Sequence, residues 1–98
     1  MRIRFTSRAV GDLEAALGHY GDIGSELGID FREDFGAALD RMVMFPKGAP
    51  PVDGFPGVRR ARMRRFPYGI FYRPDAEDLL VLRVLHAKQD RGTALVHD

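Results

Sequence analysis

Polar and apolar positions alternate along the first residues of the chain and then recur at helical spacing. The alternation over Arg2–Thr6 is typical of a half-buried strand. Thr6 or Ser7 is expected to cap the helix that follows, because a hydroxyl can accept a hydrogen bond from a free N–H of the first turn. Apolar side chains then recur every three or four positions and give this helix one buried face: Val10, Leu13, Leu17 and Tyr20.

A second apolar stripe follows a glycine-rich stretch. Gly18, Gly21 and Gly24 weaken the first helix near its end and predict a loop there. The buried stripe of the second helix consists of Leu27, Phe31, Phe35, Leu39 and Met42. Phe45-Pro46 ends this helix, since the residue before a proline disfavours α geometry. The two helices are expected to form an antiparallel hairpin.

The second half of the chain reads as a surface loop followed by strands. The loop spans residues 47–57 and is rich in Pro and Gly. Strands are expected at Val58–Arg65, Tyr68–Arg73 and Leu79–His86, with turns at Phe66-Pro67 and Pro74–Asp78. The tail from Ala87 is polar, and Thr93–Val96 is a candidate short strand.

Together these elements predict one α+β domain over residues 1–98. An N-terminal strand and a helical hairpin precede a three-stranded antiparallel meander. The strands are expected to form one mostly antiparallel sheet packed on the two helices.

Composition narrows the chemistry. The chain has no cysteine, which excludes disulfides and thiolate metal sites. No spaced set of His, Asp and Glu ligands and no phosphate-loop glycine motif occurs, so neither a metal nor an organic cofactor is expected. No apolar run is long enough for a membrane span or a signal peptide, and a cytoplasmic location is therefore expected.

The net charge of +1 is unevenly distributed. Residues 1–9 carry three arginines and no acid, whereas residues 10–57 carry nine acids against three basic residues, a balance of −6. Residues 58–98 carry nine basic residues against five acids, a balance of +4. The acidic middle and the basic ends should form different surfaces, and such an asymmetry concerns partners more than fold.

Strand alternation gathers arginines on one face of the predicted sheet. In Val58–Arg65 the arginines at even positions share a face opposite Ala61 and Met63, and Arg2 and Arg4 likewise oppose Ile3 and Phe5. In the last strand Leu80, Leu82 and Val84 should face one way, and Arg83 the other, with Leu79, Val81 and Leu85. The predicted cluster on the open face consists of Arg60, Arg62, Arg64 and Arg83, joined either by Tyr68 and Tyr72 or by Phe71.

Arginines beside aromatic rings can hold phosphates, stack on bases or bind an acidic protein segment. The alternative is a solvated sheet face whose arginines only keep the protein in solution. The residue pattern by itself leaves both interpretations open.

At this point the chain resembles the RelE/ParE toxin superfamily of bacterial type II toxin–antitoxin systems, and more closely its ParE branch. The resemblance rests on an ordered set of motifs along nearly the whole chain. These are Ser7-Arg8-Ala9 with Asp12-Leu13, the helix end Leu39–Pro46, Gly57–Arg60, the block Arg64–Arg73 and the closing Val81–His86.

The resemblance implies a plasmid-stabilisation-like toxin that arrests growth and is neutralised by a co-encoded antitoxin, with which it can form a hetero-oligomer. Members of the RelE branch cleave messenger RNA on the ribosome. Members of the ParE branch poison DNA gyrase and show no nuclease activity. A non-toxic binding module of the same fold is a third alternative.

The two toxin branches make different demands on the residues. Metal-free RNA cleavage needs a base, a cation for the phosphate and an acid. The candidates here would be Arg62, Arg83 and His86. His86 has the strand parity of Leu82 and Val84 and so is expected to be structural, and the tail has no tyrosine. The catalytic set is incomplete, which favours the gyrase-directed alternative.

The helical hairpin offers a second candidate surface. A groove beside it could receive an antitoxin segment by helix packing or by strand addition to a sheet edge. The candidate groove residues are Phe31, Phe35, Leu39 and Met42. They would mark a binding patch only if some of them stay exposed; otherwise the hairpin's outer charges are simply a solvated face.

Overall fold

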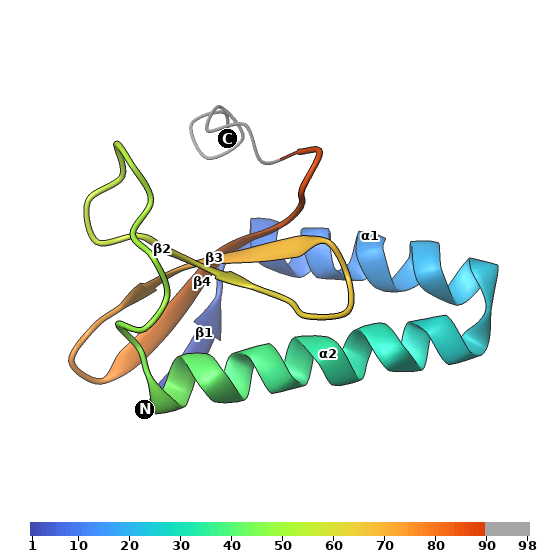
Figure 1. Ribbon diagram of the computed structural model, residues 1–98, viewed down its shortest axis with the longest axis horizontal. Helices are drawn as coiled ribbons and strands as arrows, with labels where there is room; N and C mark the ends of the chain where they lie inside the picture. Colours follow the sequence, from blue (N-terminus) through green and yellow to red (C-terminus); the bar gives the residue numbers. More distant parts are fainter. Residues whose placement is uncertain (90–98) are drawn as a thin grey trace.

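Two long helices cover one face of a four-stranded sheet (Figure 1). The computed structural model describes residues 1–89. The elements are β1 (Arg2–Phe5), α1 (Ser7–Ile23), α2 (Ser25–Met44), β2 (Arg59–Arg62), β3 (Tyr68–Pro74) and β4 (Asp78–His86). The sheet order is β1-β4-β3-β2; β1 runs parallel to β4, and the other two pairings are antiparallel. The predicted α+β fold is confirmed, and the candidate strand Thr93–Val96 lies outside the described residues.

Thr6 joins the first strand to the first helix. Its hydroxyl accepts a hydrogen bond from the Ala9 N–H at 3.1 Å and donates one to the Leu82 carbonyl at 2.7 Å. The first contact caps α1, as the sequence predicts, and the second anchors that cap to β4. The helix N-terminus is thereby fixed against the sheet.

The predicted glycine loop between the helices is wrong for two of its three glycines. Gly18 and Gly21 lie within α1, and only Gly24 separates α1 from α2. A side-chain carbon at Gly28 would lie 3.3 Å from the Gly21 Cα. Gly21 and Gly28 therefore allow the close approach of the two helix backbones, and this packing offsets the weak helix propensity of glycine.

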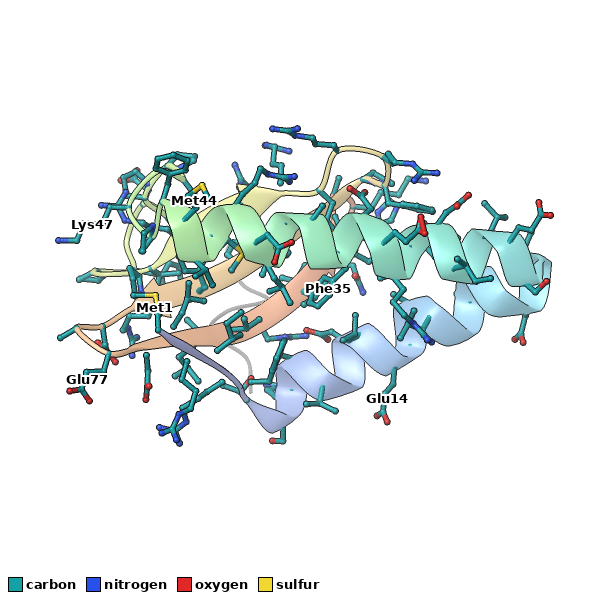
Figure 2. All side chains as sticks on the ribbon, turned by 90° about the horizontal axis from the view of Figure 1, so that it is seen from below. Met1, Glu14, Phe35, Met44, Lys47 and Glu77 are labelled. Atoms are coloured by element: carbon teal, nitrogen blue, oxygen red, sulfur yellow. The ribbon has the colours of Figure 1, made fainter. Side chains whose placement is uncertain are left out.

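The main core lies between the helices and the sheet. Its most buried large side chains include Phe31, Ile70, Tyr72, Leu79 and Val81, and Phe35 lies in the same layer, between the helices and the sheet (Figure 2). Aromatic rings also pack edge to face or stacked at one end of this layer. The members of that aromatic group are Tyr20, Phe31, Phe66 and Tyr68, with centroid separations between 4.8 and 6.2 Å.

A second, smaller core lies on the opposite face of the sheet. Val58, Phe71 and Leu85 are buried there, and Val52, Phe55 and Leu82 pack against them. The segment over residues 50–58 therefore folds back onto the face that the sequence analysis treats as open. This segment is called the covering loop below.

A β-bulge in β4 overturns part of the predicted alternation. Phe71 pairs with Arg83 while the next residue, Tyr72, pairs with Val81, so Leu82 is an extra residue on β4. Val84 consequently joins the core beside the helices, and Leu85 joins the second core. The predicted facing holds through Leu82 and is wrong after it, because an inserted residue reverses the parity of the residues that follow.

Strand β2 ends three residues earlier than predicted because the backbone after Arg62 forms hydrogen bonds to a buried carboxylate instead of to β3. Asp34 of α2 is 4% exposed and accepts hydrogen bonds from three consecutive backbone N–H groups. These belong to Arg64, Arg65 and Phe66, at 3.2, 2.8 and 3.1 Å. The Arg64–Phe66 turn is thus tied to α2 instead of continuing the ladder with β3.

Replacing Asp34 with alanine should destabilise the protein by about 2–4 kcal/mol, because three N–H groups lose their acceptor in a partly buried setting. The measurement is urea unfolding followed by circular dichroism. The matched control is Asp30→Ala, which removes only the exposed Asp30–Arg65 ion pair at 3.2 Å and should cost at most about 0.5 kcal/mol. Equal losses in the two variants would contradict this role of Asp34.

Candidate functional site

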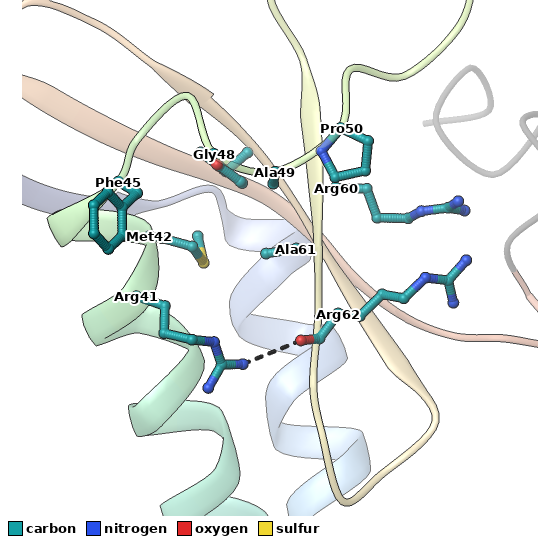
Figure 3. A pocket seen from close by; sticks show the side chains of 10 residues that line it. Arg41, Met42, Phe45, Gly48, Ala49, Pro50, Arg60, Ala61 and Arg62 are labelled. Atoms are coloured by element: carbon teal, nitrogen blue, oxygen red, sulfur yellow. Dashed lines mark hydrogen bonds between the residues drawn. The ribbon is translucent and has the colours of Figure 1, made fainter.

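Arg60 and Arg62 lie on the sheet face opposite the helices, as the alternation predicts. Arg60 pairs across the strands with Phe71, and its guanidinium sits 5.9 Å from the centroid of that ring. Figure 3 shows the Arg60 and Arg62 side chains extending to the same side of β2. Arg64 belongs to the turn held by Asp34, beyond the end of the strand.

Arg83 does not join this group. Its Nε and Nη2 donate to the two carboxylate oxygens of Asp12 on α1, at 2.8 and 3.0 Å, and Asp12 also accepts the Val84 N–H at 2.9 Å. Both side chains are 16% exposed. The bidentate pair joins α1 to the bulge of β4, so the predicted convergence of Arg83 with Arg60, Arg62 and Arg64 is wrong.

The two candidate tyrosines face the helices, and Phe71 is the aromatic residue that accompanies the arginines. Tyr72 is fully buried and donates its hydroxyl to the Pro46 carbonyl at 2.7 Å. Burial raises the pKa of the Tyr72 hydroxyl, and burial together with neighbouring Tyr20 raises the pKa of Tyr68 to about 12. Both phenols therefore stay neutral near pH 7. Their rings pack in the main core and do not contribute to the arginine face.

The residues proposed for nuclease chemistry lie apart. Arg62 is on the edge strand β2, and Arg83 is held by Asp12. The ring of His86 packs edge to face against Tyr68 at 5.2 Å, and its Nδ1 accepts the Lys88 N–H at 3.0 Å. His86 thus occupies the helix side of the sheet, while Arg62 points away from it.

Of the four residues predicted to form a groove on α2, only Met42 lines a groove, and it does so from within the core. Phe31, Phe35 and Met42 are buried in the main core, and Leu39 packs against it. A stripe of apolar residues at helical spacing is what a helix needs to cover a sheet, and these four side chains are used for that purpose. The exposed apolar residues near the end of α2 are not the ones predicted to form the groove.

Those residues lie where α2 ends. Met44 is 72% exposed and Phe45 65% exposed, and Met1 lies at the same end of the molecule (Figure 2). The sequence analysis treats Phe45-Pro46 only as a helix stop. One signal in the sequence could have revealed the exposed Phe45. This residue follows Met42, the last residue of the buried stripe, and so lies past the part of α2 that packs on the core.

Phe45 borders a groove of about 510 Å³ between the end of α2 and strand β2 (Figure 3). Met42, Ala49 and Ala61 contribute apolar lining, and three arginines lie around it: Arg41, Arg60 and Arg62. We call it the β2 groove. Its volume falls within the range of ligand-binding clefts, and its cations suit an anionic partner.

The β2 groove runs along an edge of the sheet. The Arg60 N–H, directed away from β3, bonds to the Pro50 carbonyl at 3.0 Å, and the Arg62 carbonyl accepts from the Arg41 guanidinium at 3.2 Å. Arg59 fixes the far end by donating to the carbonyls of Lys47 and Ala49 at 3.0 and 2.8 Å. At Arg59 and Arg60 the edge pairs with the backbone of Pro50 and Pro51 rather than with a full strand. Only the part of the edge beyond Arg60 is therefore open to strand addition.

Within residues 1–89 no cluster of three or more His, Asp or Glu side chains suitable for a metal ion occurs. No helix in that part of the chain is both long and apolar enough to cross a membrane.

Comparisons with known proteins agree with this geometry. The sequence matches the family described as "ParE toxin of type II toxin-antitoxin system, parDE" over residues 3–91. No curated protein sequence matches it. A solved structure described as "Chromosomal ParDE TA system from P. aeruginosa" superposes with a TM-score of 0.74 at 26% identity, covering 88% of this chain and 95% of that one.

Two further structures share the fold at lower identity. The E. coli DinJ-YafQ toxin-antitoxin complex matches with a TM-score of 0.65 at 14% identity, covering 90% of this chain and 93% of that one. A second crystal structure of the E. coli DinJ-YafQ complex matches with a TM-score of 0.66 at 13% identity, covering 92% and 98%. At such identities the likeness concerns the fold alone.

The Asp12–Arg83 pair gives a testable consequence for stability. Arg83→Ala should cost about 2–4 kcal/mol in the free energy of unfolding, because it leaves a mostly buried carboxylate without its cation. Arg4→Ala is the control: Arg4 pairs with Asp78 at 3.4 Å on the surface and its loss should cost at most about 0.5 kcal/mol. Urea unfolding of Arg83→Ala, Asp12→Ala and the double variant measures the coupling between them. Strictly additive losses would show that the pair contributes no stability of its own.

Proposed function

Since the chain belongs to the ParE toxin family of type II toxin–antitoxin systems, we propose that it inhibits DNA gyrase and is neutralised by a cognate antitoxin. Residues 1–98 would act as a single toxin domain in the cytoplasm, where gyrase works on DNA. The observation that carries the gyrase-directed activity is the separation of Arg62, Arg83 and His86, since metal-free RNA cleavage would need its acid, base and cation at one phosphate. Arg83 is engaged with Asp12, and His86 packs on Tyr68.

We also propose the β2 groove as the antitoxin's binding site. Arg41, Arg60 and Arg62 surround an apolar lining that includes Met42 and Phe45. An extended segment carrying acids around one apolar residue fits this arrangement in charge and shape. Backbone pairing along the edge of β2 would add affinity, and the resulting complex would be a toxin–antitoxin hetero-oligomer. The solved neighbours described as toxin–antitoxin systems support this kind of partner.

The gyrase activity is tested with purified chain, gyrase and supercoiled plasmid. The expected result is loss of supercoiling together with stalled gyrase–DNA cleavage complexes. A purified translation reaction serves as the second arm, and messenger RNA is expected to stay intact in it. Full supercoiling at excess toxin would overturn the proposal. Cleavage of messenger RNA at codons in the translation reaction would instead show that the protein acts on the ribosome, like the RelE branch.

The antitoxin site is tested with Phe45→Ala and Arg41→Glu. Each should weaken antitoxin binding about tenfold or more, because an exposed aromatic anchor and a cation at the groove are the contacts that dominate interface energies. Isothermal titration calorimetry with the co-encoded antitoxin gives the affinities. Ile29→Ala is the matched control, since Ile29 is 57% exposed on α2 but lies outside the groove. An equal loss in the control would place the interface elsewhere.

A further inference from the structure

A second hollow lies beside the covering loop, on the sheet face opposite the helices. This hollow has a volume of about 330 Å³. Its lining joins an apolar group, Phe55, Val58 and Leu82, to a polar group, Thr6, Arg8, Arg73 and Arg83. It shares no lining residue with the β2 groove. We call it the loop pocket.

One of its three guanidiniums is held by an ion pair, and the stem of a second lies beside the covering loop. Asp12 binds Nε and Nη2 of Arg83 and so fixes the plane of that guanidinium. The stem of Arg73 lies along Gly57, where an added side-chain carbon would stand 3.8 Å from the Arg73 Cγ and Nε. Gly57 has φ of 80°, a left-handed conformation that turns the covering loop into Val58. The loop therefore forms one side of the pocket and lies beside the Arg73 side chain.

Thr6 contributes shape more than binding. Its hydroxyl is already used by the Leu82 carbonyl and the Ala9 N–H. Those bonds hold β1, the start of α1 and β4 together beneath the pocket. The loop pocket is thus built from four parts of the chain that the fold fixes relative to one another.

The electrostatics of the loop pocket select an anion. Three arginines line it and no acid does; Asp12 neutralises part of that charge from beside Arg83. A concave site lined by one sign of charge focuses its field and concentrates counter-ions. Guanidinium groups match the oxygen geometry of a phosphate better than an ammonium does. Phe55, Val58 and Leu82 add apolar lining to the same pocket, against which a ring could pack.

We propose that the loop pocket binds a nucleoside phosphate. The phosphate contacts Arg8, Arg73 and Arg83, and the base and sugar lie against Phe55, Val58 and Leu82. The volume suits one nucleotide, at the small end of the range for ligand sites. This activity is separate from gyrase inhibition and from the β2 groove, and the same chemistry can come from a free mononucleotide or from one unit of a nucleic-acid strand.

The test is calorimetric titration of the purified chain with deoxyadenosine monophosphate and, separately, with pyrophosphate, at constant ionic strength. Saturable binding at one site is expected. Arg73→Gln, a change at an exposed side chain, should weaken both ligands about tenfold through loss of a charge-assisted contact. Phe55→Leu should weaken the mononucleotide about fivefold by removing a stacking ring, while pyrophosphate binding should stay within about twofold.

The matched control is Arg62→Gln, which removes the same charge from the same sheet face but from the β2 groove. It should leave both ligands unaffected. An octanucleotide identifies the source: tighter binding than the mononucleotide with the same dependence on Arg73 indicates a strand, and equal binding indicates a free nucleotide. No saturable binding, or equal weakening by Arg62→Gln and Arg73→Gln, overturns the proposal. None of these outcomes depends on gyrase or an antitoxin.

Discussion

The carboxylate of Asp34 determines where the arginine-rich strand β2 ends. A carboxylate that accepts three successive N–H groups acts as a fixed anchor for a turn, because each bond restricts a different peptide plane. With Arg64, Arg65 and Phe66 bound to α2, strand β2 stops at Arg62. The Arg62 carbonyl is then within reach of Arg41 on the same helix. The β2 groove therefore takes its shape from one buried acid.

Many of the arginines stabilise the fold rather than await a ligand. Arg59 satisfies two carbonyls beyond the end of α2, Arg41 satisfies one on β2, and Arg83 binds Asp12. A guanidinium suits such positions because its several donors lie in one plane and it stays charged at any ordinary pH. An arginine in this sequence therefore does not by itself indicate a binding site. Arg41 and Arg83 also line the two hollows. Only position in the fold shows whether an arginine stabilises the chain, lines a hollow, or does both.

The sequence predicted the fold well because the elements depend on periodicity. The positions of the strands and the helical hairpin follow from alternation and from three- and four-residue spacing, which local chemistry imposes. The strand order, with β1 parallel to β4, was not predicted. The site was less predictable. The bulge at Leu82 reverses the facing of Val84 and Leu85 without any glycine or proline to reveal it. Asp34 looks like any other acid of an acidic helix, and its burial depends on a turn thirty residues away. The covering loop reads as a surface loop, although Phe55 and Val58 give it a core of its own.

The pairing of β1 with β4 also has a consequence for how the protein is made. Arg2 pairs with Asp78 and Phe5 with Val81, so the first strand joins the sheet through partners about as far along the chain as the fold allows. Contacts this distant in sequence form slowly, because a long loop must close first. During synthesis the helical hairpin can form early, but β1 has no place to bind until β4 has left the ribosome. The protein should therefore gain its complete sheet only late in synthesis.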